Sequence, residues 1–169
     1  MDKKELKKIT TRIYEEFGFI KKGKYYYLDL DVVLICSGFG HSRGIGMSYL
    51  AYNFSLKEFH KESEIQPNNM FDGFDSIEHR IVINEGQKGY YIHEIQAENY
   101  TEEQYETILK KAIDKTFKPF KENALEHIKK GYTTVGYLED NRRFLIHLDI
   151  VKALGFPEYK PPEYDPRDI

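Results

Sequence analysis

The glycine-rich segment 37–46 holds the side chains best suited to meet an anion. Its four glycines bracket His41, Ser42 and Arg43. A phosphate-binding loop needs backbone N–H groups at the start of a helix, whereas this segment leads into a stretch typical of a strand. Neither the dinucleotide fingerprint nor the P-loop context is therefore met. We expect a flexible connection between strands, in which glycine supplies positive φ, with His41 and Arg43 as candidate anion-binding residues.

Two histidines flank the turn predicted around Gly86. In one register of that hairpin, His79 lies opposite His93, and the pair could bind a metal ion with one further ligand. In the register shifted by one residue, Glu94 faces His79 instead, as in a general-base pair. No HExxH-type spacing supports zinc. The simpler expectation is two half-buried histidines satisfied by their neighbours, so we predict no metal ion or other cofactor and assign no catalytic residue.

The nucleophilic side chains also lack a catalytic context. Cys36, the single cysteine, lies in a predicted buried strand, which favours an inert thiol. One cysteine excludes an internal disulfide and a cysteine-rich zinc module. Ser42 is outside any GxSxG motif. The sequence therefore favours a protein that is not an enzyme.

Aromatic side chains suggest recognition. The chain has 14 Tyr and 11 Phe but no Trp. Because Tyr25, Tyr26 and Tyr27 alternate across a predicted strand, at least one ring faces outward. Exposed tyrosines suit protein recognition, and we take Tyr25 and Tyr27 as candidate binding residues. Half-burial on the sheet is the plainer alternative.

The elements that must position these residues follow from hydrophobic periodicity and breakers. The pattern predicts a helix over 3–17 that ends at Gly18, and a long helix from Thr101 to Gly131 that Pro119 should kink. It predicts a short helix over 144–154 and strands within 19–30, 32–36, 47–56, 77–83 and 90–95. Since strands and helices are segregated, we expect an α+β fold. A mostly antiparallel sheet of about five strands would be covered on one face by helices.

Length and composition bound the class of protein. With 169 residues and 20.0 kDa, we expect a single domain over 1–157 and an extended or disordered tail over 158–169. No apolar run reaches the roughly 18 residues that span a bilayer. The N-terminus lacks the order of segments typical of a signal peptide. The expected location is the cytoplasm, with no membrane partner.

Charge is distributed unevenly along the chain. The net charge is −3, but residues 1–25 and 107–155 each carry +4, whereas residues 26–106 carry −9. Nucleic-acid binding usually needs a net basic field, so this balance argues against a nucleic-acid partner. An acidic surface would instead attract a basic protein partner.

The segment after the first helix, Gly18-Phe19-Ile20-Lys21-Lys22-Gly23-Lys24-Tyr25-Tyr26-Tyr27, carries a resemblance. It resembles a family of small bacterial α+β proteins, classed only as a domain of unknown function, whose members open with a helix and a GF-x-K-K-x-G-x-x-Y/F segment. Related small domains occur among immunity proteins encoded beside polymorphic toxins. The resemblance covers about the first third of the chain. It implies a fold and a bacterial setting, and it carries no catalytic residues.

The leading hypothesis is a non-enzymatic, cytoplasmic protein-binding domain of the toxin-immunity type, which would act by covering a basic toxin. One alternative is an enzyme, a small-ligand protein or a metal-binding protein that uses His79, His93 and Glu94, or the loop around His41 and Arg43. The other is single-stranded nucleic-acid binding through residues 21–27. No oligomeric state is predicted.

Overall fold

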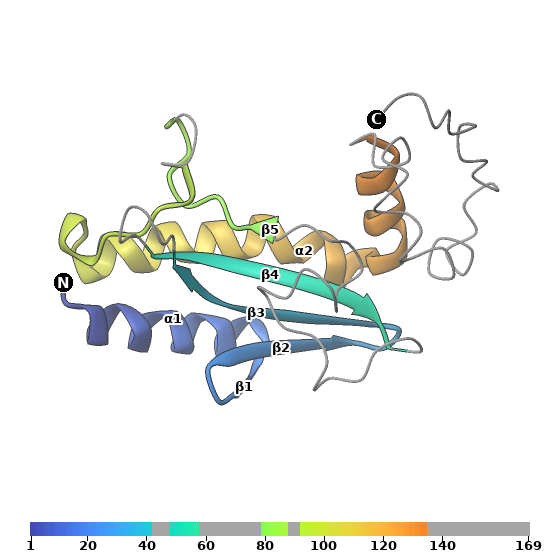
Figure 1. The fold of residues 1–169 in the computed structure, drawn as a ribbon, viewed down its shortest axis with the longest axis horizontal. Coiled ribbons are helices and arrows are strands. Elements are labelled where there is room, and N and C mark those ends of the chain that lie inside the picture. The colour runs from blue at the N-terminus through green and yellow to red at the C-terminus, as the bar shows by residue number, and fades with distance from the viewer. Residues whose placement is uncertain (42–47, 58–78, 88–91, 135–169) are drawn as a thin grey trace, which may run out of the picture.

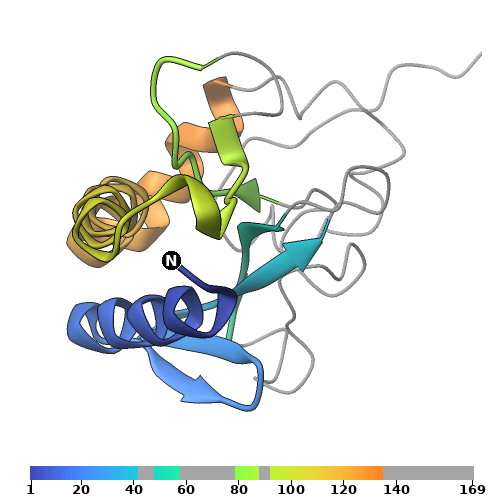
Figure 2. The same cartoon turned by 90° about the vertical axis from the view of Figure 1, so that its left-hand side faces the viewer.

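The computed structural model describes residues 1–41, 48–57, 79–87 and 92–134. Two helices cover one face of a five-stranded antiparallel sheet, so the predicted α+β architecture is confirmed (Figures 1 and 2). The elements in chain order are α1 (Lys3–Phe17), β1 (Ile20–Lys22), β2 (Tyr25–Leu30), β3 (Val33–His41), β4 (Ser48–Leu56), β5 (His79–Arg80), the 3₁₀ turn η3 (Ala97–Asn99) and α2 (Glu102–Thr134).

The first helix forms where the sequence predicts it. Asp2 caps α1 by accepting the backbone N–H of Glu5 at 2.8 Å. Gly18 ends the helix with a φ of 111°, a conformation that glycine adopts without steric cost. The chain then folds back, and the rings of Tyr14 and Phe19 meet edge to face with centroids 4.8 Å apart. Local sequence signals therefore mark both ends of this helix.

The strands follow one another in the sheet in chain order. The stretch over 19–30 forms two strands, because Gly23, with a φ of 61°, turns the chain so that Lys22 pairs with Tyr25. The next connection is a tight hairpin, in which Leu30 pairs with Val33. We call β1 and β2 with the turn between them the β1–β2 hairpin.

The expected loop over 37–46 is wrong for its first half. Residues 37–41 extend β3, and Gly40 pairs with Tyr49 of β4. Neither Gly38 nor Gly40 has a positive φ. Glycine is needed at position 40 for space, since a Cβ there would lie 2.3 Å from the Tyr49 ring. Residues 42–47, with Ser42 and Arg43, are outside the described part of the chain.

The hairpin predicted around Gly86 also differs from expectation. Of the described residues in the two predicted strands, only His79 and Arg80 form a strand, β5, which pairs with β4. The backbone N–H groups of Ile83 and Asn84 both donate to the Ile92 carbonyl, at 2.8 and 2.9 Å. Because two donors converge on one acceptor, no regular ladder continues there. Ile95 instead forms an isolated β-bridge with β4, in which its backbone N–H donates to the Ser48 carbonyl.

The long helix begins directly after Thr101, as the sequence predicts, and its start is closed by a capping box. The Gln104 N–H donates to Thr101 Oγ1 at 3.2 Å, and the Thr101 N–H donates to Gln104 Oε1 at 3.0 Å. The kink lies at Asn123, with φ −162° and ψ 92°, and not at Pro119. Asn123 Oδ1 accepts the N–H of Glu126 at 3.2 Å and so caps the segment that follows. Figure 1 shows the change of direction at the orange end of α2.

The predicted end of α2 at Gly131 is three residues short, because the helix continues to Thr134. The helix expected over 144–154 and the tail over 158–169 lie outside the described residues. The proposed domain boundary at 157 therefore stays a prediction.

The core lies between the helices and the sheet. α1 and α2 lie side by side and run in the same direction (Figures 1 and 2). Both contribute apolar side chains to one buried cluster with the inner face of the sheet, including Ile13, Tyr14, Ile35, Leu50, Phe54, Leu109, Ile113 and Phe117. Burial of this continuous cluster is the main driving force for the observed packing.

Candidate functional site

A large groove lies beside the N-terminal part of α1. Its volume is about 1100 Å³, and its walls come from α1, the β1–β2 hairpin, the end of β3 and the start of α2. We call it the α1 groove. It brings together two of the candidate binding residues, Tyr25 and His41. The groove is therefore the place where the described structure gathers sequence-predicted site residues.

The centre of the groove holds a small polar network. Lys21 Nζ donates to Thr11 Oγ1 at 3.3 Å, and the same oxygen lies 2.9 Å from the Tyr26 hydroxyl. Tyr26 is only 3% exposed as a residue, and its ring stacks on that of Tyr14 with centroids 4.5 Å apart. Burial raises the pKa of Tyr26, while the hydrogen bond to Thr11 opposes that shift. The phenol is thus held in place and stays protonated at neutral pH.

The end of β3 contributes His41. Ser37, Phe39 and His41 alternate on the face of the sheet that points to the helices, as the bond from Tyr14 to Ser37 also shows. His41 is exposed, and its Nδ1 lies 3.3 Å from Ser48 Oγ. Half-buried Phe39 lies beside it in the groove wall.

Tyr25 and Tyr27 lie on the other face of the β1–β2 hairpin. Tyr26 is buried toward the helices, and its two neighbours are half-buried against Leu34 and Cys36. The alternation expected for the three tyrosines is therefore present.

The outer face of the hairpin also carries an unusual exposed side chain. Ile20 is 61% exposed and is paired directly with Tyr27. Lys22 Nζ and Lys24 Nζ lie 5.9 and 4.9 Å from the ring centroids of Tyr27 and Tyr25. We call Ile20, Lys22, Lys24, Tyr25 and Tyr27 the hairpin patch.

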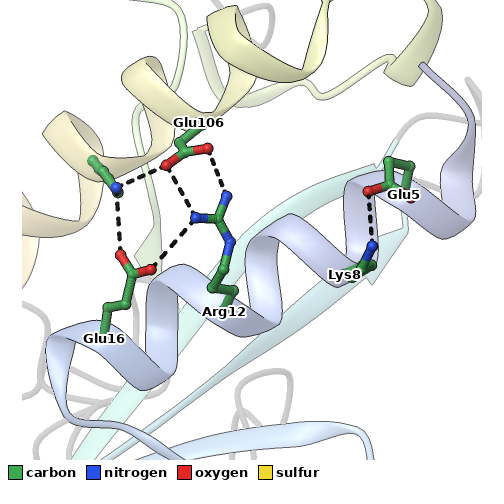
Figure 3. Close-up of polar contacts among 6 residues, drawn as sticks. Glu5, Lys8, Arg12, Glu16 and Glu106 are labelled. Carbon is green, nitrogen blue, oxygen red and sulfur yellow. Dashed lines mark hydrogen bonds and ion pairs between the residues drawn. The ribbon is translucent and has the colours of Figure 1, made fainter.

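A charged network joins the two helices along the groove (Figure 3). Arg12 donates to both carboxylate oxygens of Glu106, at 2.5 and 3.2 Å. Lys110 completes the network, with Nζ 2.8 Å from Glu106 and 3.4 Å from Glu16. The hydrogen bonds from Arg12, and then from Lys110, lower the pKa of Glu106 to about 2. Arg12 and Glu106 are thus committed to each other.

The acidic middle of the chain is partly neutralised by the chain itself. Glu85 accepts hydrogen bonds from Lys111 and Lys115 at 2.6 and 2.7 Å, and Asp29 pairs with Lys57 at 2.7 Å. Other acids at the start of α2 have no ion pair with a described residue, namely Glu98, Glu102 and Glu103. Among the described residues, these three carboxylates therefore leave uncompensated negative charge near the start of α2.

The structure forms neither register proposed for the two histidines. His79 faces Tyr52 of β4 and lies between aromatic rings, with centroids 5.0 Å from Tyr52 and 5.4 Å from Phe54. His93 Nδ1 lies 3.1 Å from the carbonyl oxygen of Ile81. Within residues 1–41, 48–57, 79–87 and 92–134, no three His, Cys, Asp or Glu side chains are arranged to hold a metal ion.

The thiol is placed as the sequence predicts. Cys36 is buried in β3.

Sequence reasoning missed the contribution of α1 to the groove. Lys7, Lys8 and Thr11 line it and share one side of the helix, because residues three or four positions apart are neighbours on a helix surface. The available signal was Thr11 itself, a hydroxyl among lysines and glutamates. The partner of Thr11, Tyr26, lies 15 residues away, so the network depends on tertiary packing.

Comparisons with known proteins leave the chain without an assigned family. No known protein-family model matches it, no curated protein is significantly similar, and no solved structure has a significantly similar fold. The resemblance to bacterial immunity domains stays a prediction. None of the helices in the described residues is both long and apolar enough to cross a membrane.

Proposed function

We propose that this chain is a bacterial, cytoplasmic, non-enzymatic protein-binding module of the toxin-immunity type. We further propose that it binds its partner through the hairpin patch and the adjoining α1 groove. The observation that carries the proposal is the position of Ile20, a large aliphatic side chain that is 61% exposed beside two half-buried tyrosines.

The hairpin patch has the composition of a protein interface. Interfaces combine an apolar, aromatic centre with a polar rim, and tyrosine is enriched among the residues that dominate binding energy. Here Ile20, Tyr25 and Tyr27 supply the centre, and Lys22 and Lys24 supply the rim. Ile20 lies in a short strand at the edge of the sheet. A partner that covers this side chain removes apolar surface from water, and that burial favours binding.

The charge pattern supports a partner with a basic surface. The groove connects the β1–β2 hairpin with Glu102 of α2, and Glu98 and Glu103, which are close to Glu102 in the chain, are also exposed. A basic toxin would be attracted to this acidic end, while its apolar or acidic residues would meet the hairpin patch. Such complementarity increases the association rate and selects the partner. An immunity protein of this kind acts by covering the toxin and needs no chemistry of its own.

The test uses the product of the gene adjacent to the one that encodes this chain. Co-purification followed by calorimetry would measure binding to the intact chain. Ile20→Ala and Tyr25→Ala are each expected to weaken binding about tenfold or more. Val32→Ala is the matched control, because Val32 is the other large hydrophobic side chain exposed in the described part of the chain, at 45%, and lies in the β2–β3 turn.

Two results would count against the proposal. If the neighbouring gene product does not bind, the toxin-immunity assignment loses its support. If it binds and Val32→Ala weakens binding as much as Ile20→Ala, the hairpin patch is not the binding surface. A separate experiment tests the proposed attraction of a basic partner. The double variant Glu102→Gln with Glu103→Gln should bind the partner more slowly at low salt and at nearly the same rate at high salt.

A further inference from the structure

We infer that the α1 groove contains an oxyanion-binding site formed by Lys21, Thr11 and Tyr26, which takes a carboxylate or phosphoryl group. This site goes beyond the proposed protein-binding function, and it is tested without the partner protein.

The hydrogen-bond inventory of the network shows an excess of donors. Lys21 uses one of its three N–H groups on Thr11. One hydroxyl proton lies between Thr11 and Tyr26, whichever of the two donates. Two N–H groups of Lys21 and one hydroxyl proton then have no acceptor among the described residues. Three donors that meet in one groove fit an oxyanion, because its oxygens are strong acceptors without donors of their own.

The donors are held in place before any ligand arrives. Tyr26 is buried and stacked on Tyr14, and Thr11 belongs to a capped helix. The Thr11 bond orients Lys21 across the groove from β1. A donor set that is already ordered loses less conformational entropy on binding, which favours affinity.

The surrounding charges favour an anion. Lys7 and Lys24 also line the groove and have no ion pair with a described residue. His41, at the end of β3, adds a further donor to the same wall. Arg12 is committed to Glu106, so it does not contribute to this site.

Other groove residues weaken or oppose the site. Lys8 contacts Glu5 at 3.4 Å, which offsets its charge. Glu15 and Glu102 also line the groove, and the charge of Glu15 reaches Tyr26, where it helps to raise the pKa of the phenol. Glu15 should therefore repel a bound anion, and its removal should strengthen binding. Glu15→Gln should therefore raise the affinity for an anion. A network with only a structural role would not show this increase.

The probes are inorganic phosphate and acetate, each titrated into the full chain at low ionic strength. Amide chemical shifts would be followed by NMR, with chloride at matched ionic strength as the reference. Phosphate distinguishes a phosphoryl ligand from acetate, which represents a carboxylate side chain. Saturable shifts at the amides of residues 11, 21 and 26 are expected with at least one probe. The absence of saturation with both probes would overturn the proposal.

Four variants test the assignment of the residues. Lys21→Ala should weaken binding about tenfold, since a hydrogen bond to a charged group is lost. Tyr26→Phe keeps the ring and should weaken binding about threefold to fivefold, whereas Glu15→Gln should strengthen it. Lys118→Ala, an exposed lysine on α2, is the matched control and should bind as the original chain does.

Unfolding curves would be recorded for every variant, so that a loss of fold is not mistaken for a loss of binding. If a folded Lys21→Ala binds phosphate and acetate as tightly as the original chain, the site is wrongly assigned. If Lys118→Ala weakens binding as much as Lys21→Ala, binding is a non-specific effect of surface charge, and the proposal fails.

Discussion

The Tyr14 hydroxyl donates a hydrogen bond of 2.8 Å to Ser37 Oγ in the middle of the core. The direction follows from the serine, whose single proton goes to the Ala51 carbonyl, also at 2.8 Å. Tyr14 and Ser37 are fully buried, and burial raises the pKa of Tyr14 well above its ordinary value. This chain of bonds links α1 through β3 to β4, and it explains how a serine is accommodated on the inner face of the sheet.

Ser37→Ala should lower the free energy of unfolding more than Tyr14→Phe does. Ser37→Ala leaves the Tyr14 hydroxyl buried without an acceptor, so we expect a loss of about 1–3 kcal/mol in the free energy of unfolding. Tyr14→Phe removes the donor, while Ser37 keeps its bond to Ala51, so about 1 kcal/mol is expected. Urea unfolding of both single variants and the double variant measures the coupling. Additive losses would show that the bond does not contribute.

The close approach of Tyr49 to Gly40 makes a second prediction. A methyl group at position 40 would lie 2.3 Å from the Tyr49 ring, so Gly40→Ala should destabilise the protein by about 1–3 kcal/mol. In a Tyr49→Ala background the same substitution should cost much less, because the ring is absent. Thermal or urea unfolding of the four combinations checks this. An equal cost in both backgrounds would show that backbone conformation, and not space, requires the glycine.

The carboxylate of Glu106 gives a pH-dependent contribution to stability. Its pKa falls from 4.5 to about 2 in the folded chain, so folding favours the ionised form. The contribution is complete above pH 4.5 and is lost as the pH falls through about 2. Because the carboxylate is partly exposed to solvent, salt should reduce the effect.

The measurement is the midpoint of urea unfolding between about pH 5 and 2. Glu106→Gln should flatten part of the decline that the original chain shows in this range. Glu103→Gln is the matched control, because Glu103 lies in the first turn of the same helix and has no ion pair with a described residue. An identical pH profile for Glu106→Gln and the original chain would contradict the prediction.

Local signals made part of the fold predictable. Gly18 ends α1 and the Thr101 capping box begins α2, as expected, because both depend on residues within four positions. The end of β3 was not predictable in this way. Gly38 and Gly40 favour a loop when only neighbouring residues are considered, and the ring that makes Gly40 necessary belongs to another strand.

The candidate site shows the same division. Alternation places Tyr25 and Tyr27 on one face, and the sequence therefore identifies the aromatic part of the hairpin patch. The α1 groove was not predictable, because Thr11 and Tyr26 meet only once α1 packs on β2. For His79 and His93, the sequence predicted a contact that the structure does not form. A hairpin would place the two histidines opposite each other, but β5 pairs with β4, and His79 therefore lies opposite Tyr52.

The kink in α2 allows a last test, in which two neighbouring positions should behave differently. Pro119 lies inside the helix, whereas Asn123 has the non-helical backbone and caps the segment after it. Asn123→Ala removes that cap and should cost about 1 kcal/mol. Pro119→Ala restores a backbone donor without touching the cap, so it should leave stability equal or raise it. Urea unfolding compares the two, and helix content by circular dichroism confirms that each variant is folded. If Pro119→Ala is the more destabilising change, the proline and not the asparagine cap supports the bend.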